Sequence, residues 1–204
     1  MEATSEIQTK CELLLAAYRA KGRDPSSDLL PPASHAELLE VSAWFPAALP
    51  DPLLELYSWH NGQPKDAWDT EPERIFWFRD MQFTSLERAA LEYRSLMESY
   101  GADDYWNEAK GVSLRSCFPF AAFNGGWYVV PCAGQRLDPR HSLPVISVFQ
   151  GVDIHFYSLS QMLDTCIEWR EASTWNDREL WYLDEADENR IWRKHNPGIF
   201  ENAI

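Results

Sequence analysis

The sequence has few cysteines, no long apolar run and few positive charges. Its four cysteines, Cys11, Cys117, Cys132 and Cys166, form no CxxC pair, so we expect reduced, buried thiols. No stretch approaches the roughly 18 apolar residues of a membrane helix. The first four residues, 1–4, contain neither a basic nor an apolar signal segment. We therefore expect a cytoplasmic protein that makes no membrane contact.

The shortage of positive charge restricts the kinds of partner. The chain has 18 Lys and Arg against 32 Asp and Glu, a formal net charge of −14. Direct binding to nucleic acid needs Lys and Arg to displace counterions from phosphates, so we expect none. An acidic surface suits a basic protein partner and speeds its association. The alternative is that the charge serves only solubility.

Signals for catalysis and for metal binding are also missing. A nucleophile could be formed by Cys117 or Cys132 with His141 or His155, but their spacing does not indicate contact. The histidines are isolated, without an HxxxH pattern: His35, His60, His141, His155 and His195. The Gly125-Gly126 pair is explained by a turn and not by a phosphate-binding loop. We expect no enzymatic activity, no cofactor and no metal.

The stretch from Leu49 to Gly62 predicts a short amphipathic helix. Asp51 is the expected N-cap and Pro52 the first helical residue. The spacing i, i+3, i+4, i+7 predicts one buried face: Leu53, Leu56, Tyr57 and His60. Asn61-Gly62 tolerate the left-handed turn that ends a helix.

Capping patterns predict further helices. Each begins at Ser or Thr with Glu or Gln three residues later, and each carries an apolar stripe. The expected ranges are Glu6–Lys21 after Ser5, Ser34–Phe45, Thr84–Tyr100 with Glu87, and Ser158–Arg170. Arg178–Lys194 is also expected to be helical.

Short apolar runs separated by turns predict strands. They cover residues 75–78, 118–121, 127–130, 145–149 and 154–157. Asn124-Gly125 is a strong hairpin signal because both residues accept a positive φ. Helices, then a meander of strands, then a helix indicate an α+β fold. We expect a central twisted, mostly antiparallel sheet of about 4–6 strands, covered on one side by helices.

Three blocks in this order carry a family resemblance. They are Leu49–Gly62, the strand pair from Cys117 to Val130, and the hairpin Pro144–Tyr157 with the helix Ser158–Arg170. Over Pro31–Arg170 the chain resembles the SUKH superfamily, which includes the fungal cell-wall assembly regulator and many bacterial immunity proteins. The expected organisation is an N-terminal helix and connector in residues 1–30, a SUKH-like domain in residues 31–172, and a helical extension in residues 173–204.

The resemblance implies a non-enzymatic protein that binds and neutralises a toxin from a competing or sister cell. Such toxins are often nucleases or deaminases, and a net charge of −14 suits a basic one. The alternative is a regulatory scaffold that binds endogenous partners, as in the fungal regulator. We expect a monomer or weak dimer.

Two acidic loops with aromatic residues are the expected partner-binding sites. Ring burial supplies affinity, and charge supplies rate and orientation. The residues are Asp66, Trp68, Asp69, Glu71, Asp103, Asp104, Tyr105 and Trp106. The alternative is that these are solvated loops whose tryptophans fold back onto the sheet.

Overall fold

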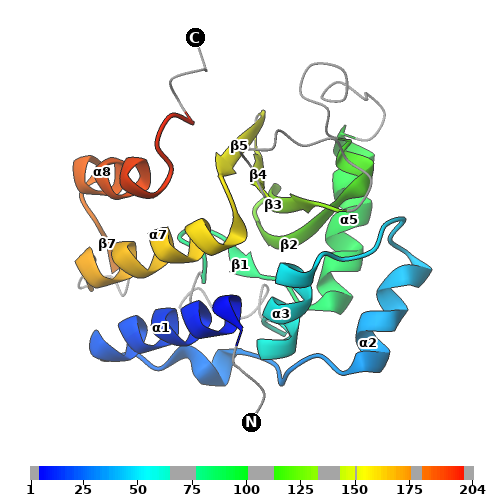
Figure 1. Cartoon of the computed structure of the whole chain (residues 1–204), viewed down its shortest axis with the longest axis horizontal. Helices are drawn as coiled ribbons and strands as arrows, with labels where there is room; N and C mark the ends of the chain where they lie inside the picture. The colour runs from blue at the N-terminus through cyan, green and yellow to red at the C-terminus, as the bar shows by residue number, and fades with distance from the viewer. Residues whose placement is uncertain are drawn as a thin grey trace.

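A five-stranded antiparallel sheet with the strand order β1-β2-β3-β4-β5 forms the centre of the protein (Figure 1). The computed structural model describes residues 5–64, 77–100, 113–132, 143–149, 151–175 and 181–199. The strands are β1 (Gln82–Phe83), β2 (Cys117–Phe123), β3 (Gly126–Pro131), β4 (Val145–Val148) and β5 (Val152–Phe156). The predicted α+β class, with an antiparallel sheet covered by helices, is confirmed.

Helices lie against both faces of this sheet (Figure 1). On one face the hydrophobic core includes Phe118 and Val130 and the helices α1 (Glu6–Ala20), α3 (Asp51–Trp59) and α7 (Leu159–Ala172). On the other face Cys117 and Val129 pack with Leu96 of α5 (Leu86–Tyr100). The expectation of one covered face is wrong, because β2 and β3 bury successive side chains on opposite sides.

The β2–β3 hairpin turns at Asn124 and Gly125, which have φ values of 48° and 76°. This confirms the hairpin predicted from Asn-Gly. Within β2 the register shifts between Pro119 and Ala121, which accommodates a proline in an inner strand. The Phe120 carbonyl accepts a hydrogen bond from the Thr84 amide at 3.0 Å. The bulge therefore ties β2 to the segment that leads into α5.

Helix α3 confirms the predicted buried face at Leu53, Leu56 and Tyr57. Its cap differs from the prediction. Pro50 is the N-cap and no side chain caps the helix, so the N-cap assignment of Asp51 is wrong: Asp51 is already in the first turn. His60 follows the helix half-buried, with Nδ1 2.6 Å from the Leu30 carbonyl oxygen.

Two other predictions are corrected in the neighbouring segment. Ser85, not Thr84, caps α5, since its hydroxyl accepts a hydrogen bond from the Arg88 amide at 3.2 Å. The Thr84 hydroxyl instead donates to the Pro119 carbonyl at 3.4 Å. Trp77 and Phe78 lie outside the five strands, and the first strand is β1. The rest of the expected strand, residues 75–76, is outside the described residues.

The C-terminal helix α8 (Glu185–His195) begins later than predicted. The Asp184 side chain accepts a hydrogen bond from the Ala186 amide at 2.8 Å and fixes this start. Before it, β7 (Trp181–Tyr182) pairs with β6 (Thr174–Trp175). The predicted start at Arg178 lies outside the described part of the chain.

Helix α8 packs on α7 and hydrogen-bonds to the strand at one edge of the sheet. Trp192 Nε1 donates to the His155 carbonyl at 3.1 Å, and Asn196 Oδ1 accepts from the Tyr157 amide at 3.2 Å. Asn196 is fully buried. Because β5 is the last strand in the sheet order, these bonds satisfy backbone groups that an edge strand would otherwise expose.

Candidate functional site

The eight residues expected to bind a partner all lie outside the described residues. They are Asp66, Trp68, Asp69, Glu71, Asp103, Asp104, Tyr105 and Trp106. Their role stays a prediction from the sequence. The described side chains form a different candidate site.

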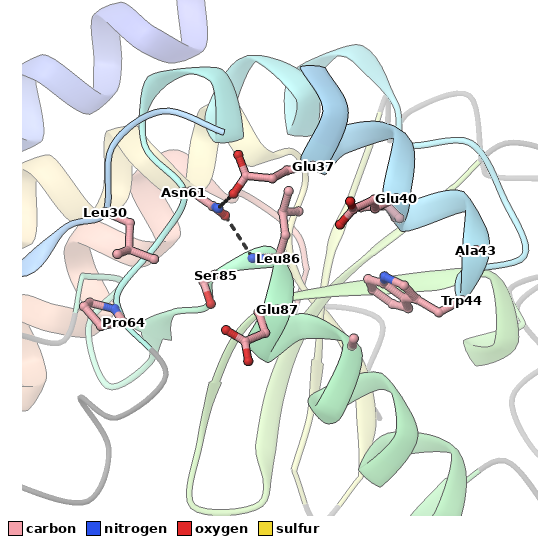
Figure 2. A pocket seen from close by; sticks show the side chains of 12 residues that line it. Leu30, Glu37, Glu40, Ala43, Trp44, Asn61, Pro64, Ser85, Leu86 and Glu87 are labelled. Atoms are coloured by element: carbon pink, nitrogen blue, oxygen red, sulfur yellow. Dashed lines mark hydrogen bonds between the residues drawn. The ribbon is translucent and has the colours of Figure 1, made fainter. Parts of the chain in front are cut away.

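A groove of about 870 Å³ lies between two helical segments and the chain that follows α3 (Figure 2). One wall is formed by α2 (His35–Glu40) and the 3₁₀ turn η2 (Val41–Ala43). The other wall is the first turns of α5, and Asn61 and Pro64 line the end between them. Three glutamates and one tryptophan give the groove its chemistry: Glu37, Glu40, Glu87 and Trp44.

A buried asparagine holds the two walls together. Asn61 is 7% exposed, and its Oδ1 accepts a hydrogen bond from the Leu86 amide at 2.9 Å. Its Nδ2 donates to Glu37 Oε1 at 3.1 Å (Figure 2). Asn61 therefore satisfies an amide at the start of α5 while binding α2. Asn61 is therefore a hydrogen-bonded bridge between the two walls at this end of the groove.

Glu37 has a structural task in addition to its place in the groove. Its Oε2 accepts hydrogen bonds from the Ser34 amide and hydroxyl, both at 2.7 Å. The Ser34 hydroxyl in turn accepts from the Glu37 amide, which completes the predicted capping box. The hydroxyl and then the amide of Ser34 lower the pKa of Glu37 below its usual value. The carboxylate is thus charged at neutral pH and fixed in direction.

Gly62 brings the chain after α3 against the start of α5. It has a φ of 65°, and a Cβ placed there would lie 2.4 Å from the Thr84 carbonyl carbon. No side chain fits at that distance. The Asn61-Gly62 pair thus has a packing and bonding role.

Glu40 and Glu87 line the groove from opposite walls (Figure 2). Both are exposed, and no Lys or Arg is among the described lining residues. Trp44 is half-buried, and its ring lies 5.6 Å from that of Phe118 and 5.9 Å from that of Tyr93. The groove therefore combines negative charge with an aromatic surface held in one orientation.

The described residues considered for a Cys–His nucleophile have other surroundings or contacts. The Cys117 thiol donates to the Ser113 carbonyl at 3.3 Å, and burial raises the pKa of Cys132 to about 12. His155 stacks on Tyr128, with ring centroids 5.5 Å apart. His141 lies outside the described residues. Where side chains are described, no three His, Cys, Asp or Glu residues gather to hold a metal ion.

Sequence reasoning did not identify Glu40, Glu87 or Trp44 as site residues. A signal existed on α2, because Glu37, Glu40 and Trp44 follow the spacing i, i+3, i+7 of one helix face. Glu87 belongs to another helix, and only the fold brings it opposite Glu40. The site could therefore be half recovered from local sequence.

Comparisons with known proteins assign no family to the chain: no protein-family model matches it, and a search of curated proteins gives no match. Among the helices that the structure describes, none is long and apolar enough to cross a membrane.

Proposed function

We propose that this chain is a non-enzymatic, cytoplasmic immunity-type protein that binds and neutralises a basic, nuclease- or deaminase-like toxin. We also propose that the groove between α2 and α5 is part of its binding surface. The observation that carries the proposal is the groove itself, which presents Glu37, Glu40, Glu87 and Trp44 without a described basic residue. The resemblance to the SUKH superfamily supports the class of partner.

The groove suits a protein partner better than a small substrate. The charged groups among its described lining residues are all negative, and all three of its glutamates are exposed. A lysine or arginine of the partner is attracted by the negative charge of the groove. The net charge of −14 adds long-range attraction, which raises the association rate. Trp44 supplies apolar area of the kind found at interface hot spots.

The test begins with affinity capture from cells of the same strain and continues with a toxicity assay of the captured protein. We expect a basic protein whose toxicity is blocked when this chain is co-expressed. A double charge reversal, Glu40→Lys with Glu87→Lys, should weaken binding at least about tenfold, because two attractions become repulsions. Protection in the toxicity assay should fall accordingly.

The matched control reverses two other exposed glutamates, Glu98→Lys with Glu171→Lys, which lie outside the groove. It changes the net charge by the same amount and should keep most of the protection. Circular dichroism must show that both variants fold, since Glu87 lies in the first turn of α5, where a lysine is unfavourable. Capture of a non-toxic endogenous enzyme would contradict the proposal and favour a regulatory scaffold.

A further inference from the structure

A second cavity, of about 310 Å³, lies near the C-terminal helix and shares no lining residue with the acidic groove. Its walls come from the turn before β1, from α7, and from the chain around α8. Three aromatic rings line it, those of Trp77, Trp169 and Tyr182, together with Leu183. Its volume is at the lower end of the roughly 300–1,000 Å³ typical of small-molecule sites.

Trp77, one of the lining residues, has an unused hydrogen-bond donor. The side chain is 1% exposed and packs between Tyr18 and Trp59, with ring centroids 5.4 and 5.6 Å away. Its Nε1 is buried, and none of the described groups accepts a hydrogen bond from it. An indole N–H can only donate, so a binding partner must bring an acceptor oxygen.

Four other buried indoles show that this is unusual among the described tryptophans. Four tryptophans each donate Nε1 to a carboxylate or carbonyl oxygen at 2.6–3.1 Å: Trp59, Trp127, Trp169 and Trp192. Buried polar groups are nearly always satisfied in this way. Among the buried, described indoles Trp77 alone has no acceptor, and it lines a cavity.

Arg79 is held at the cavity wall by a strained turn. Phe78 and Met81 exchange two backbone hydrogen bonds, of 3.1 and 3.0 Å, and Arg79 between them has a φ of 60°. Its Nε lies 2.5 Å from Glu188 Oε1, and its guanidinium is 5.2 Å from the centroid of the Trp169 ring. Non-glycine residues in this backbone region cost energy and cluster at ligand sites.

A second guanidinium lines the same cavity. Arg170 of α7 is 6% exposed and donates to the Tyr18 hydroxyl at 2.9 Å. The two acids of the wall already have partners, because Glu188 pairs with Arg79 and Asp80 accepts from the Tyr128 hydroxyl at 3.4 Å. The cavity therefore offers hydrogen-bond donors and two guanidinium groups beside aromatic surface, with two carboxylates that balance their charge.

We infer that this cavity binds a small carboxylate attached to an aromatic or similarly flat apolar group. The carboxylate oxygens accept from Trp77 Nε1 and from a guanidinium, a pairing that arginine favours. The apolar group lies against Trp169 and Tyr182. This site is separate from the acidic groove, so it does not depend on the proposed toxin binding.

The experiment follows the indole N–H resonances of the ¹⁵N-labelled protein during titration with benzoate and, separately, with benzylamine. The Trp77 signal is identified by its loss in Trp77→Phe. We expect benzoate to shift this signal saturably with a Kd of roughly 1 mM, as for a weak fragment. Benzylamine, of similar size and opposite charge, should leave it unchanged. No saturable shift with benzoate, or equal binding of the two probes, would overturn the inference.

Two variants and one control locate the binding. Arg79→Gln removes one guanidinium and should weaken benzoate binding about tenfold. Arg94→Gln, on the exposed face of α5, should leave benzoate binding unchanged. If Arg79→Gln fails to fold, Tyr182→Ala provides the test of the site. Tyr182 is 58% exposed, so its replacement does not disturb the core. Undiminished benzoate binding in the folded variants would contradict the site.

Discussion

Replacing Asn61 by alanine should lower the free energy of unfolding by about 3 kcal/mol. The substitution removes both side-chain bonds that join α2 to α5, at 2.9 Å to the Leu86 amide and at 3.1 Å to Glu37. The backbone bond from the Asn61 amide to the Pro31 carbonyl, at 3.0 Å, is kept. The loss in free energy of unfolding therefore reports on the side-chain hydrogen bonds of Asn61.

The magnitude follows from the two groups left behind. The Leu86 amide lies in a buried hydrogen bond, and a buried donor without a partner costs about 1–3 kcal/mol. The bond to Glu37 contributes less, about 0.5–1 kcal/mol, because that carboxylate is exposed to water.

Urea unfolding at neutral pH measures the loss. With a slope of about 2 kcal/mol per molar urea, the midpoint should fall by about 1.5 M at unchanged slope. Asn61→Asp is the matched variant: it keeps an acceptor for Leu86 but faces the Glu37 carboxylate. Its stability relative to wild type should recover as pH falls and one carboxyl takes up a proton. A loss below about 0.5 kcal/mol for Asn61→Ala would refute the assigned role.

Three further predictions concern stability. Gly62→Ala should abolish folding, or lower the melting temperature several times more than Gly125→Ala does. A Cβ at Gly62 would lie 2.4 Å from a backbone atom, whereas nothing lies within 4 Å of one at Gly125. Burial lowers the pKa of His155 to about 4, with Arg79 adding to the effect and Asp153 opposing it. As pH falls below about 6.5, the unfolded chain therefore takes up a proton at His155 before the folded chain does. The free energy of unfolding of wild type, measured with urea, should fall by about 2 kcal/mol between pH 7 and 5. His155→Phe should not show this loss. Trp192→Ala should expose the edge of β5 and increase aggregation, measured by light scattering, whereas Arg193→Ala on the exposed side of α8 should not.

Local chemistry made much of the fold predictable. The Asn124-Gly125 turn, the Ser34–Glu37 capping box and the buried face of α3 each depend on residues close in sequence. Such signals need no knowledge of the rest of the chain. These local signals predict the α+β class and the antiparallel meander without any tertiary contact.

The errors arose where distant contacts decide the structure. Strand β1 has only two residues, Gln82 and Phe83, and exists because β2 pairs with it. Thr84 resembled a helix cap, yet its hydroxyl bonds to Pro119 and Ser85 takes the capping role. These outcomes depend on tertiary pairing, which local propensity does not contain.

The candidate site was harder to predict for the same reason. Glu37 and Glu40 lie on one short helix, but Glu87 joins them only when α5 packs nearby. The donor-lined cavity likewise needs Trp77, Arg79 and Arg170 from different parts of the chain. Sequence reasoning concentrated instead on the two acidic loops, whose role in binding stays a prediction.

The most direct test of the proposed function is the association rate of the purified toxin with this chain as a function of salt. Wild type should bind rapidly at low ionic strength, and the rate should fall steeply as salt rises. Glu40→Lys with Glu87→Lys should bind more slowly and with a shallower dependence than Glu98→Lys with Glu171→Lys. An association rate that does not change with ionic strength, or that is equal in the two double variants, would contradict the claim that the acidic groove recognises a basic partner.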